Sequence, residues 1–440
     1  MQNTLETLGG LERRLNVAVA LADIEGEVRK RLSRLARTAK LAGFRPGKVP
    51  MKMLAQQYGS QLRSDVISEA VKSGFDDAVR AQNLRIAGTP RIEPQARDGQ
   101  PPDALEFSAV FEVYPEVELG DASQITIRRP QVEVTAADVD RTLGVLRQQR
   151  TTYSPVAREA AAGDRIRVDF TGTIDGVEFP GGHAKDFQIV LGDGQMLADF
   201  EAAVTDMKAG ESKTFPVEFP VDYHSRDVAG KKAQFALVVN EVAAACVPEL
   251  DGEFAKAFGI ASGDVADLRR EVESNLRLEL KHKVAAIVKE QALKGLREQA
   301  RFDVPKSLIE AEARNLRERT VANLRQQPGA KSEDLAIGVD VFRPQAEERV
   351  ALGLLIAELV KRHDLRAKPD QVKALVDEQA QTYEQPEAVV RWHYEKPERL
   401  VDFEAMALEQ NVVDWVLAQA KVADEPATFD AVMGPRPGAR

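Results

Sequence analysis

The sequence predicts a multidomain α+β protein with an α+β head, a β-rich middle and an extended, all-helical tail. At 440 residues, the chain is longer than one ordinary domain of about 150 residues. Alternating apolar residues are concentrated between 150 and 245, whereas apolar spacings of three and four dominate after Pro248. Hydrophobic residues at 43% and charged residues at 30% are typical of a soluble globular protein.

The head, predicted at 1–113, begins with a strand at 11–20 in which Leu15, Val17 and Val19 alternate with polar or small residues. A helix is expected from 22 to 40, because its apolar residues recur at spacings of three and four. Two further helical segments, MKMLAQQYG and SDVISEAVKSGFDDAVRAQ, lead to a closing strand, ALEFSAVFEV.

A short loop, AGFRPGKVP at 42–50, separates the first helix of the head from the next. Its glycines permit unusual backbone angles and its prolines fix φ, so the sequence predicts a shaped loop that displays its side chains. The preceding helix carries a second stripe of Lys30, Arg34 and Arg37 at helical spacing. We therefore expect a basic surface that continues into the loop.

A connector is predicted at 114–149 and a β-rich domain at 150–245. In the connector, Thr135 and Asp138 have the spacing of a capping box at the start of a short helix. In the β-rich domain, DRIRVDFTG and VEFPGG flank the pair Asp175-Gly176, which is typical of a tight hairpin turn. KTFPVEFP and KKAQFALVVNEV supply two more alternating runs.

The tail, predicted at 246–440, is expected to be helical almost throughout. Apolar periodicity and Pro305 at a helix start predict helices at about 264–300, 305–327, 343–363, 370–383 and 398–420.

Charge is unevenly distributed along the chain. The net charge is −10, but residues 12–52 hold eleven Lys and Arg against four Asp and Glu. This leaves +7 in the head and −17 elsewhere, which suits a protein whose head alone approaches a polyanion. A basic helix face that is simply solvated is the alternative interpretation.

Several classes of protein are excluded by the sequence. The N-terminal residues lack the pattern of a signal peptide, and no run of about 18 apolar residues occurs, so we expect a cytoplasmic protein without membrane contact. A single cysteine, Cys246, rules out an internal disulfide, and five scattered histidines argue against a metal site. No GxxxxGK[ST] phosphate loop is present. We therefore expect no cofactor.

Three segments carry a family resemblance: GFRPGKVP in the head, FTGTIDGVEFPGG with FQIVLGDGQML in the middle, and AMALEQNVVDWVLAQAKV in the tail. In this order they resemble the trigger factor family of ribosome-associated bacterial chaperones, from the first residues to about Met433. The resemblance implies that the loop docks on the large ribosomal subunit beside the polypeptide exit tunnel, touching a ribosomal protein and rRNA. The implied ribosome contacts are Gly43, Phe44, Arg45, Gly47 and Lys48. Pro46 departs from the lysine that family members often have there.

The middle domain resembles an FKBP-type prolyl isomerase, which implies an apolar pocket that favours a twisted prolyl bond and uses no nucleophile. The implied pocket residues are Phe170, Phe179, Phe187, Met196, Leu197, Phe200, Tyr223 and Phe235. Tyr223 is expected to donate a hydrogen bond to the substrate carbonyl. Taken singly, each phenylalanine could equally be an ordinary core residue. Asp199 and Ala203 stand where the family usually has glycine, so the isomerase could be weak.

The resemblance implies a chaperone that binds nascent and unfolded polypeptides without ATP, and that can form a homodimer away from the ribosome. The tail would supply the main client surface, although Met406, Leu308, Ile309 and Val350 could equally be packing residues. A second hypothesis is an RNA-binding ribosome-assembly factor with an inactive isomerase-like domain. The β-rich isomerase pattern and the acidic tail favour the chaperone, because an RNA scaffold needs neither.

Overall fold

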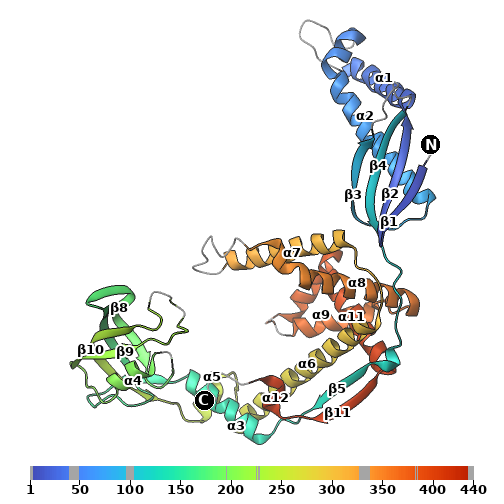
Figure 1. Ribbon diagram of the computed structural model, residues 1–440. Helices are drawn as coiled ribbons and strands as arrows, with labels where there is room; N and C mark the ends of the chain where they lie inside the picture. The colour runs from blue at the N-terminus through green and yellow to red at the C-terminus, as the bar shows by residue number, and fades with distance from the viewer. Residues whose placement is uncertain are drawn as a thin grey trace. The chain divides into compact units, whose positions relative to one another are not determined.

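The computed structural model describes residues 3–38, 49–95, 104–194, 196–223, 225, 228–326, 337–381, 383 and 385–434. By internal contacts the chain divides into two compact units. The first unit comprises 1–129 with 287–423, and the second comprises 130–286 with 424–440. Helices and strands are mixed as predicted, with strands dominating the middle and helices the tail (Figure 1).

The head is an antiparallel four-stranded sheet with two helices, drawn in blue in Figure 1. Its elements are β1 (Asn3–Gly9), β2 (Glu12–Ala20), α1 (Leu21–Thr38), α2 (Met51–Ala81), β3 (Ile86–Gln95) and β4 (Ala104–Val113), in the sheet order β1-β2-β4-β3. Leu15 and Val17 of β2 form one core with Ile24 and Val28 of α1 and Phe75 of α2. The predicted strand at 11–20 and the predicted helix at 22–40 are confirmed.

The structure of the head differs from the sequence prediction in two respects. The two helical segments after the loop form one continuous helix, α2, because Gly59 alone does not break a helix in which no proline or cap intervenes. Strand β3 was not predicted, because it contains Pro90 and Pro94. It lies at the edge of the sheet, where a residue without an N–H group is tolerated.

The connector contains η1 (Ala122–Gln124), β5 (Thr126–Gln131) and α3 (Ala136–Gln149). The predicted capping box is confirmed at α3. The Thr135 hydroxyl accepts from the backbone N–H of Asp138 at 3.3 Å, and the Asp138 carboxylate accepts from the N–H of Thr135 at 3.0 Å. The two side chains thus each satisfy an N–H group at the helix start, where the usual intrahelical partners are missing.

Replacing Thr135 with alanine is expected to destabilise α3 by about 1 kcal/mol, because the hydroxyl cap is lost. Hydrogen exchange of the α3 amides measures the effect. Thr135→Ser is the matched control, since it keeps the hydroxyl group. Equal loss of protection in both variants would contradict the capping role.

The middle domain is a five-stranded sheet with a short helix, drawn in green in Figure 1. Its elements are β6 (Thr152–Pro155), β7 (Arg165–Ile174), β8 (Val177–Val190), α4 (Ala198–Val204), β9 (Ser212–Glu218) and β10 (Lys232–Cys246). The sheet order is β6-β10-β7-β8, and β9 also pairs with β10. The predicted hairpin is confirmed, because Asp175 and Gly176 both have positive φ, as a type I′ turn requires.

The tail is predominantly helical, as predicted. Its elements are α5 (Gly252–Ala257), α6 (Val265–Gln299), α7 (Lys306–Arg325), η3 (Val339–Phe342), α8 (Arg343–His363), α9 (Pro369–Ala380), α10 (Pro386–Tyr394), η4 (Pro397–Arg399), α11 (Val401–Gln419), β11 (Lys421–Pro426) and α12 (Phe429–Met433). Strand β11, which pairs with β5, was not anticipated. Among the helices of the described ranges, none has the length and apolar character to cross a membrane.

Candidate active site

A cavity of about 410 Å³ opens in the middle domain, between β7, β8, β10, the start of α4 and the segment after β9. Seven of the eight residues predicted for the prolyl pocket line it, namely Phe170, Phe179, Met196, Leu197, Phe200, Tyr223 and Phe235. The other lining residues are Pro180, Gly181, Gly194, Val217, Phe219, Ser225 and Val228. None of these described lining residues carries a charge. The cavity therefore offers an apolar, aromatic environment with Tyr223 and Ser225 as its hydroxyl groups.

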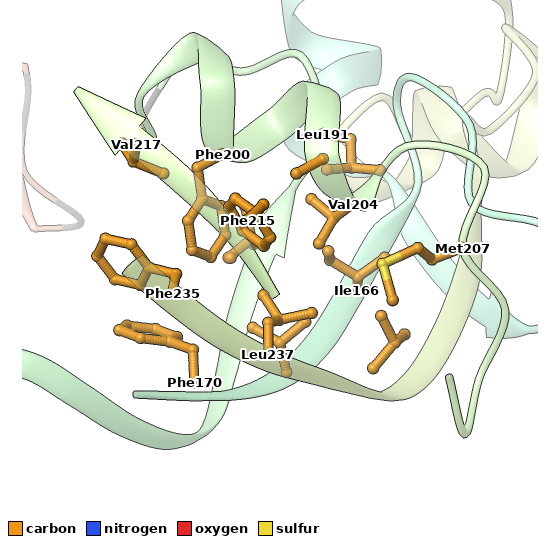
Figure 2. Packing of buried hydrophobic residues seen from close by; sticks show 14 of the residues in the cluster. Ile166, Phe170, Leu191, Phe200, Val204, Met207, Phe215, Val217, Phe235 and Leu237 are labelled. Carbon is orange, nitrogen blue, oxygen red and sulfur yellow. The ribbon is translucent and has the colours of Figure 1, made fainter. Parts of the chain in front are cut away.

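Phe235 is central to the aromatic wall. Its ring centroid lies 5.8 Å from that of Phe170, 6.1 Å from that of Phe179 and 5.6 Å from that of Phe200. Figure 2 shows Phe170, Phe200 and Phe235 grouped within the buried cluster of the domain. Because edge-to-face rings hold one another at defined angles, the wall is a preformed surface.

Phe187 is the exception among the predicted pocket residues. It belongs to β8 at the edge of the sheet, is 42% exposed and does not line the cavity. Its ring instead contacts that of Phe170 edge-to-face at 5.8 Å. Phe187 thus supports the wall from outside through this contact with Phe170.

A bulge precedes Phe187 in β8 and is held by a carboxylate of β7. The pairing shifts between Val168 and Phe170, and Asp186 has a positive φ. The Asp169 carboxylate accepts from the N–H of Asp186 at 2.7 Å and from the Asn240 amide at 2.9 Å. The bond from Asp186 is the main reason that the pKa of Asp169 lies below its usual value. Asp169 stays ionised at neutral pH and satisfies the N–H that the bulge removes from the strand pairing.

Two glycines of the quoted motifs make room for the aromatic rings. A Cβ atom on Gly172 would lie 2.8 Å from Cε1 of Phe235 and 3.0 Å from Cε1 of Phe179. A Cβ atom on Gly182 would lie 2.9 Å from the carbonyl oxygen of Gly172 and 3.0 Å from Cζ of Phe179. Both glycines are therefore needed for the aromatic rings to approach the backbone closely. The sequence motifs alone did not reveal this steric role.

Phe219 is the largest lining residue that sequence reasoning missed. It contacts Tyr223 with ring centroids 4.9 Å apart, and Phe179 at 5.9 Å. A signal was available, because Phe215, Val217 and Phe219 alternate within the quoted run KTFPVEFP and so share one face.

The predicted ribosome contacts Gly43, Phe44, Arg45, Gly47 and Lys48 lie outside the described residues. The structure does describe both flanks of this loop. On the N-terminal side, Lys30, Arg34 and Arg37 of α1 are exposed, as their stripe predicted. On the C-terminal side, Val49 and Leu54 are buried in the head core.

Comparison with known proteins covers the chain nearly end to end. The family model for the bacterial trigger factor protein matches residues 1–146, that for its C-terminus matches 264–418, and that for FKBP-type peptidyl-prolyl cis-trans isomerase matches 156–242. Proteins described as "Trigger factor" from Aromatoleum aromaticum and Laribacter hongkongensis are 51% and 50% identical to it. Each alignment covers 99% of this chain and 99% or more of the relative.

The chain belongs to the trigger factor family. It is accordingly a ribosome-associated chaperone that binds nascent chains, and its middle domain is an FKBP-type peptidyl-prolyl isomerase. The alternative of an RNA-binding assembly factor with an inactive isomerase-like domain is not favoured by these matches.

Asp199 and Ala203, the two residues expected to replace glycines of the trigger factor family, both lie in α4. Asp199 stands exposed in the first turn, and Ala203 is buried against the domain core. Neither residue has a positive φ, so an α-helical backbone accommodates both side chains without strain. The Ala203 carbonyl oxygen accepts from Nζ of Lys213 at 2.8 Å, which holds the end of α4 against β9.

Proposed function

We propose that the aromatic cavity of the middle domain is where prolyl bonds isomerise. The observation that carries this proposal is the preformed set of Phe170, Phe179, Phe200 and Phe235 around a cavity whose described lining residues are all uncharged. Phe187 is included as a support for Phe170. Met196, Leu197 and Tyr223 complete the proposed pocket.

The proposed mechanism follows from the electronic structure of the prolyl bond. A planar imide is stabilised by resonance that separates charge, and rotation crosses a barrier of about 18–20 kcal/mol. The twisted transition state loses this charge separation, so an apolar cavity that excludes water favours it over the planar ground state. Tyr223 would donate a hydrogen bond to the substrate carbonyl and so orient it. Uncatalysed isomerisation takes about 10–100 s, which leaves a wide margin for acceleration.

We propose that residues 43–48 form the ribosome-docking tip, placed beside the exit tunnel against a ribosomal protein and rRNA. Phe44 would enter an apolar recess, Arg45 would engage carboxylate or phosphate with its planar fork, and Lys48 would add a point charge. The described residues on either side support this role, because Val49 and Leu54 are anchored in the head core and α1 carries exposed cations.

Replacing Phe44, Arg45 and Lys48 with alanine is expected to reduce co-sedimentation with bacterial 70S ribosomes at least tenfold in physiological salt. The variant loses one apolar anchor and two cations, which carry binding to an anionic partner. The control removes one exposed apolar residue and two exposed cations of the second unit, as Val177→Ala with Lys256→Ala and Arg270→Ala. Equal binding by the loop variant and the control would refute the docking role.

We also propose the finer assignments that the family suggests. The protein would act in the cytoplasm and would dimerise when free of the ribosome. The chain would divide into four functional parts: the head at 1–113, the connector at 114–149, the isomerase domain at 150–245 and the helical tail at 246–440. The contiguous sheet of β6 to β10 and the FKBP match at 156–242 support its third part.

A further inference from the structure

A charged residue, Asp199, lies beside the cavity described above without being one of its lining residues. Asp199 is exposed in the first turn of α4, two residues after Leu197 and directly before Phe200, and both neighbours line the cavity. An oxygen of its carboxylate lies 3.5 Å from the backbone nitrogen of Glu218. Glu218 stands between Val217 and Phe219, which also line the cavity. The Asp199 carboxylate therefore lies between two segments of the chain that contribute lining residues to the cavity.

The charge of Asp199 is not compensated nearby in the part of the chain that the structure describes. The carboxylate of the adjacent Glu218 lies 3.3 Å from Nζ of Lys232 and is paired. No lysine or arginine nitrogen among the described residues lies within 4.0 Å of the Asp199 carboxylate. Apolar walls with low polarisability strengthen the field of such a charge at the cavity mouth.

We propose that Asp199 is a specificity-determining residue of the isomerase, which favours substrates with lysine or arginine next to the proline. The inference rests on the proposed prolyl pocket. The described lining residues are uncharged, so they accept the prolyl ring but do not distinguish the charge of the residues beside it. Those residues lie beside the cavity, where Asp199 attracts a cation and repels a carboxylate.

The test measures kcat/KM of the full-length protein for three tetrapeptides, Ala-Xaa-Pro-Phe with Xaa as Lys, Glu or Leu. The ratio of kcat/KM for the Lys peptide to that for the Glu peptide is expected to fall about three- to tenfold in Asp199→Asn. Asp199→Lys is expected to invert the preference. Because the interaction is exposed to solvent, the wild-type ratio should shrink towards one between 0.05 M and 1 M salt.

Glu159→Gln is the matched control, since it removes an exposed carboxylate whose neighbours do not line the cavity. It should leave the Lys-to-Glu ratio at the wild-type value. A wild-type ratio near one, or an equal ratio in the wild type and Asp199→Asn, would overturn the specificity role while leaving the isomerase in place. No acceleration of the Leu peptide would overturn the proposed pocket itself, and the specificity role with it.

Discussion

Phe235→Ala is expected to abolish most of the isomerase activity and to destabilise the middle domain by about 3–5 kcal/mol. The side chain is 6% exposed and lies within van der Waals range of several rings. Removing a buried phenylalanine costs this amount because apolar contact is lost and a void remains. Phe170, Phe179 and Phe200 would lose the ring that sets their angles, so a fall of at least tenfold in kcat/KM is expected.

Leu237→Ala is the matched control for this prediction. Leu237 lies two residues further along β10, is 1% exposed and does not line the cavity. It should also destabilise the domain, by about 2–5 kcal/mol, but the folded fraction should keep its kcat/KM. Stability is best followed by hydrogen exchange of the β7 and β10 amides, because Trp392 and Trp415, the two tryptophans of the chain, both lie in the tail. Equal activity of the folded Phe235→Ala and Leu237→Ala proteins would disprove the role of Phe235.

Gly172→Ala is expected to lower kcat/KM by about tenfold while the protein still folds. Gly172 does not have a positive φ, so alanine meets no backbone penalty there. The added Cβ atom would instead lie 2.8 Å from the Phe235 ring and must push it into or across the cavity. Overpacking of this kind costs about 1–3 kcal/mol. Prolyl-peptide kinetics and thermal unfolding of the same preparation measure both effects.

Gly144→Ala provides the contrasting glycine substitution. Gly144 lies in α3, and apart from its own helix no described atom lies within 4 Å of its prospective Cβ atom, so alanine should stabilise the helix by about 0.5–1 kcal/mol. Its isomerase activity should equal that of the wild type. If Gly172→Ala behaved in the same way as Gly144→Ala, close packing of Gly172 would not be what positions the aromatic wall.

Local sequence patterns predicted those elements whose own residues determine them. The spacing of Ile24, Val28 and Leu32 determined α1, and the pair Asp175-Gly176 determined the hairpin. Patterns failed where long-range pairing decides the outcome. The proline-containing β3 and β11, whose residues are all exposed, have little strand character of their own. Each becomes a strand because β4 or β5 offers backbone partners.

The candidate site shows the same division. A family pattern could identify the pocket residues, and seven of the eight line the cavity. It could not show that Phe187 supports the wall from the sheet edge, because that depends on strand order. The steric roles of Gly172 and Gly182 and the contact of Asp199 with Glu218 were likewise invisible, since they depend on distances across the fold.

The pairing of β11 with β5 has a consequence for how the protein folds while it is being synthesised. The backbone N–H of Lys421 donates to the carbonyl of Ile125, and that of Ala427 donates to the carbonyl of Gln131, so the connector is completed by residues that follow it far along the chain. At about 5–20 residues per second, the roughly 300 residues between them take about 15–60 s to synthesise. During that interval, β5 has left the ribosome without its partner strand, whereas the contiguous middle domain can already close. A chaperone of emerging chains thus passes through the same exposed, half-paired state as its clients.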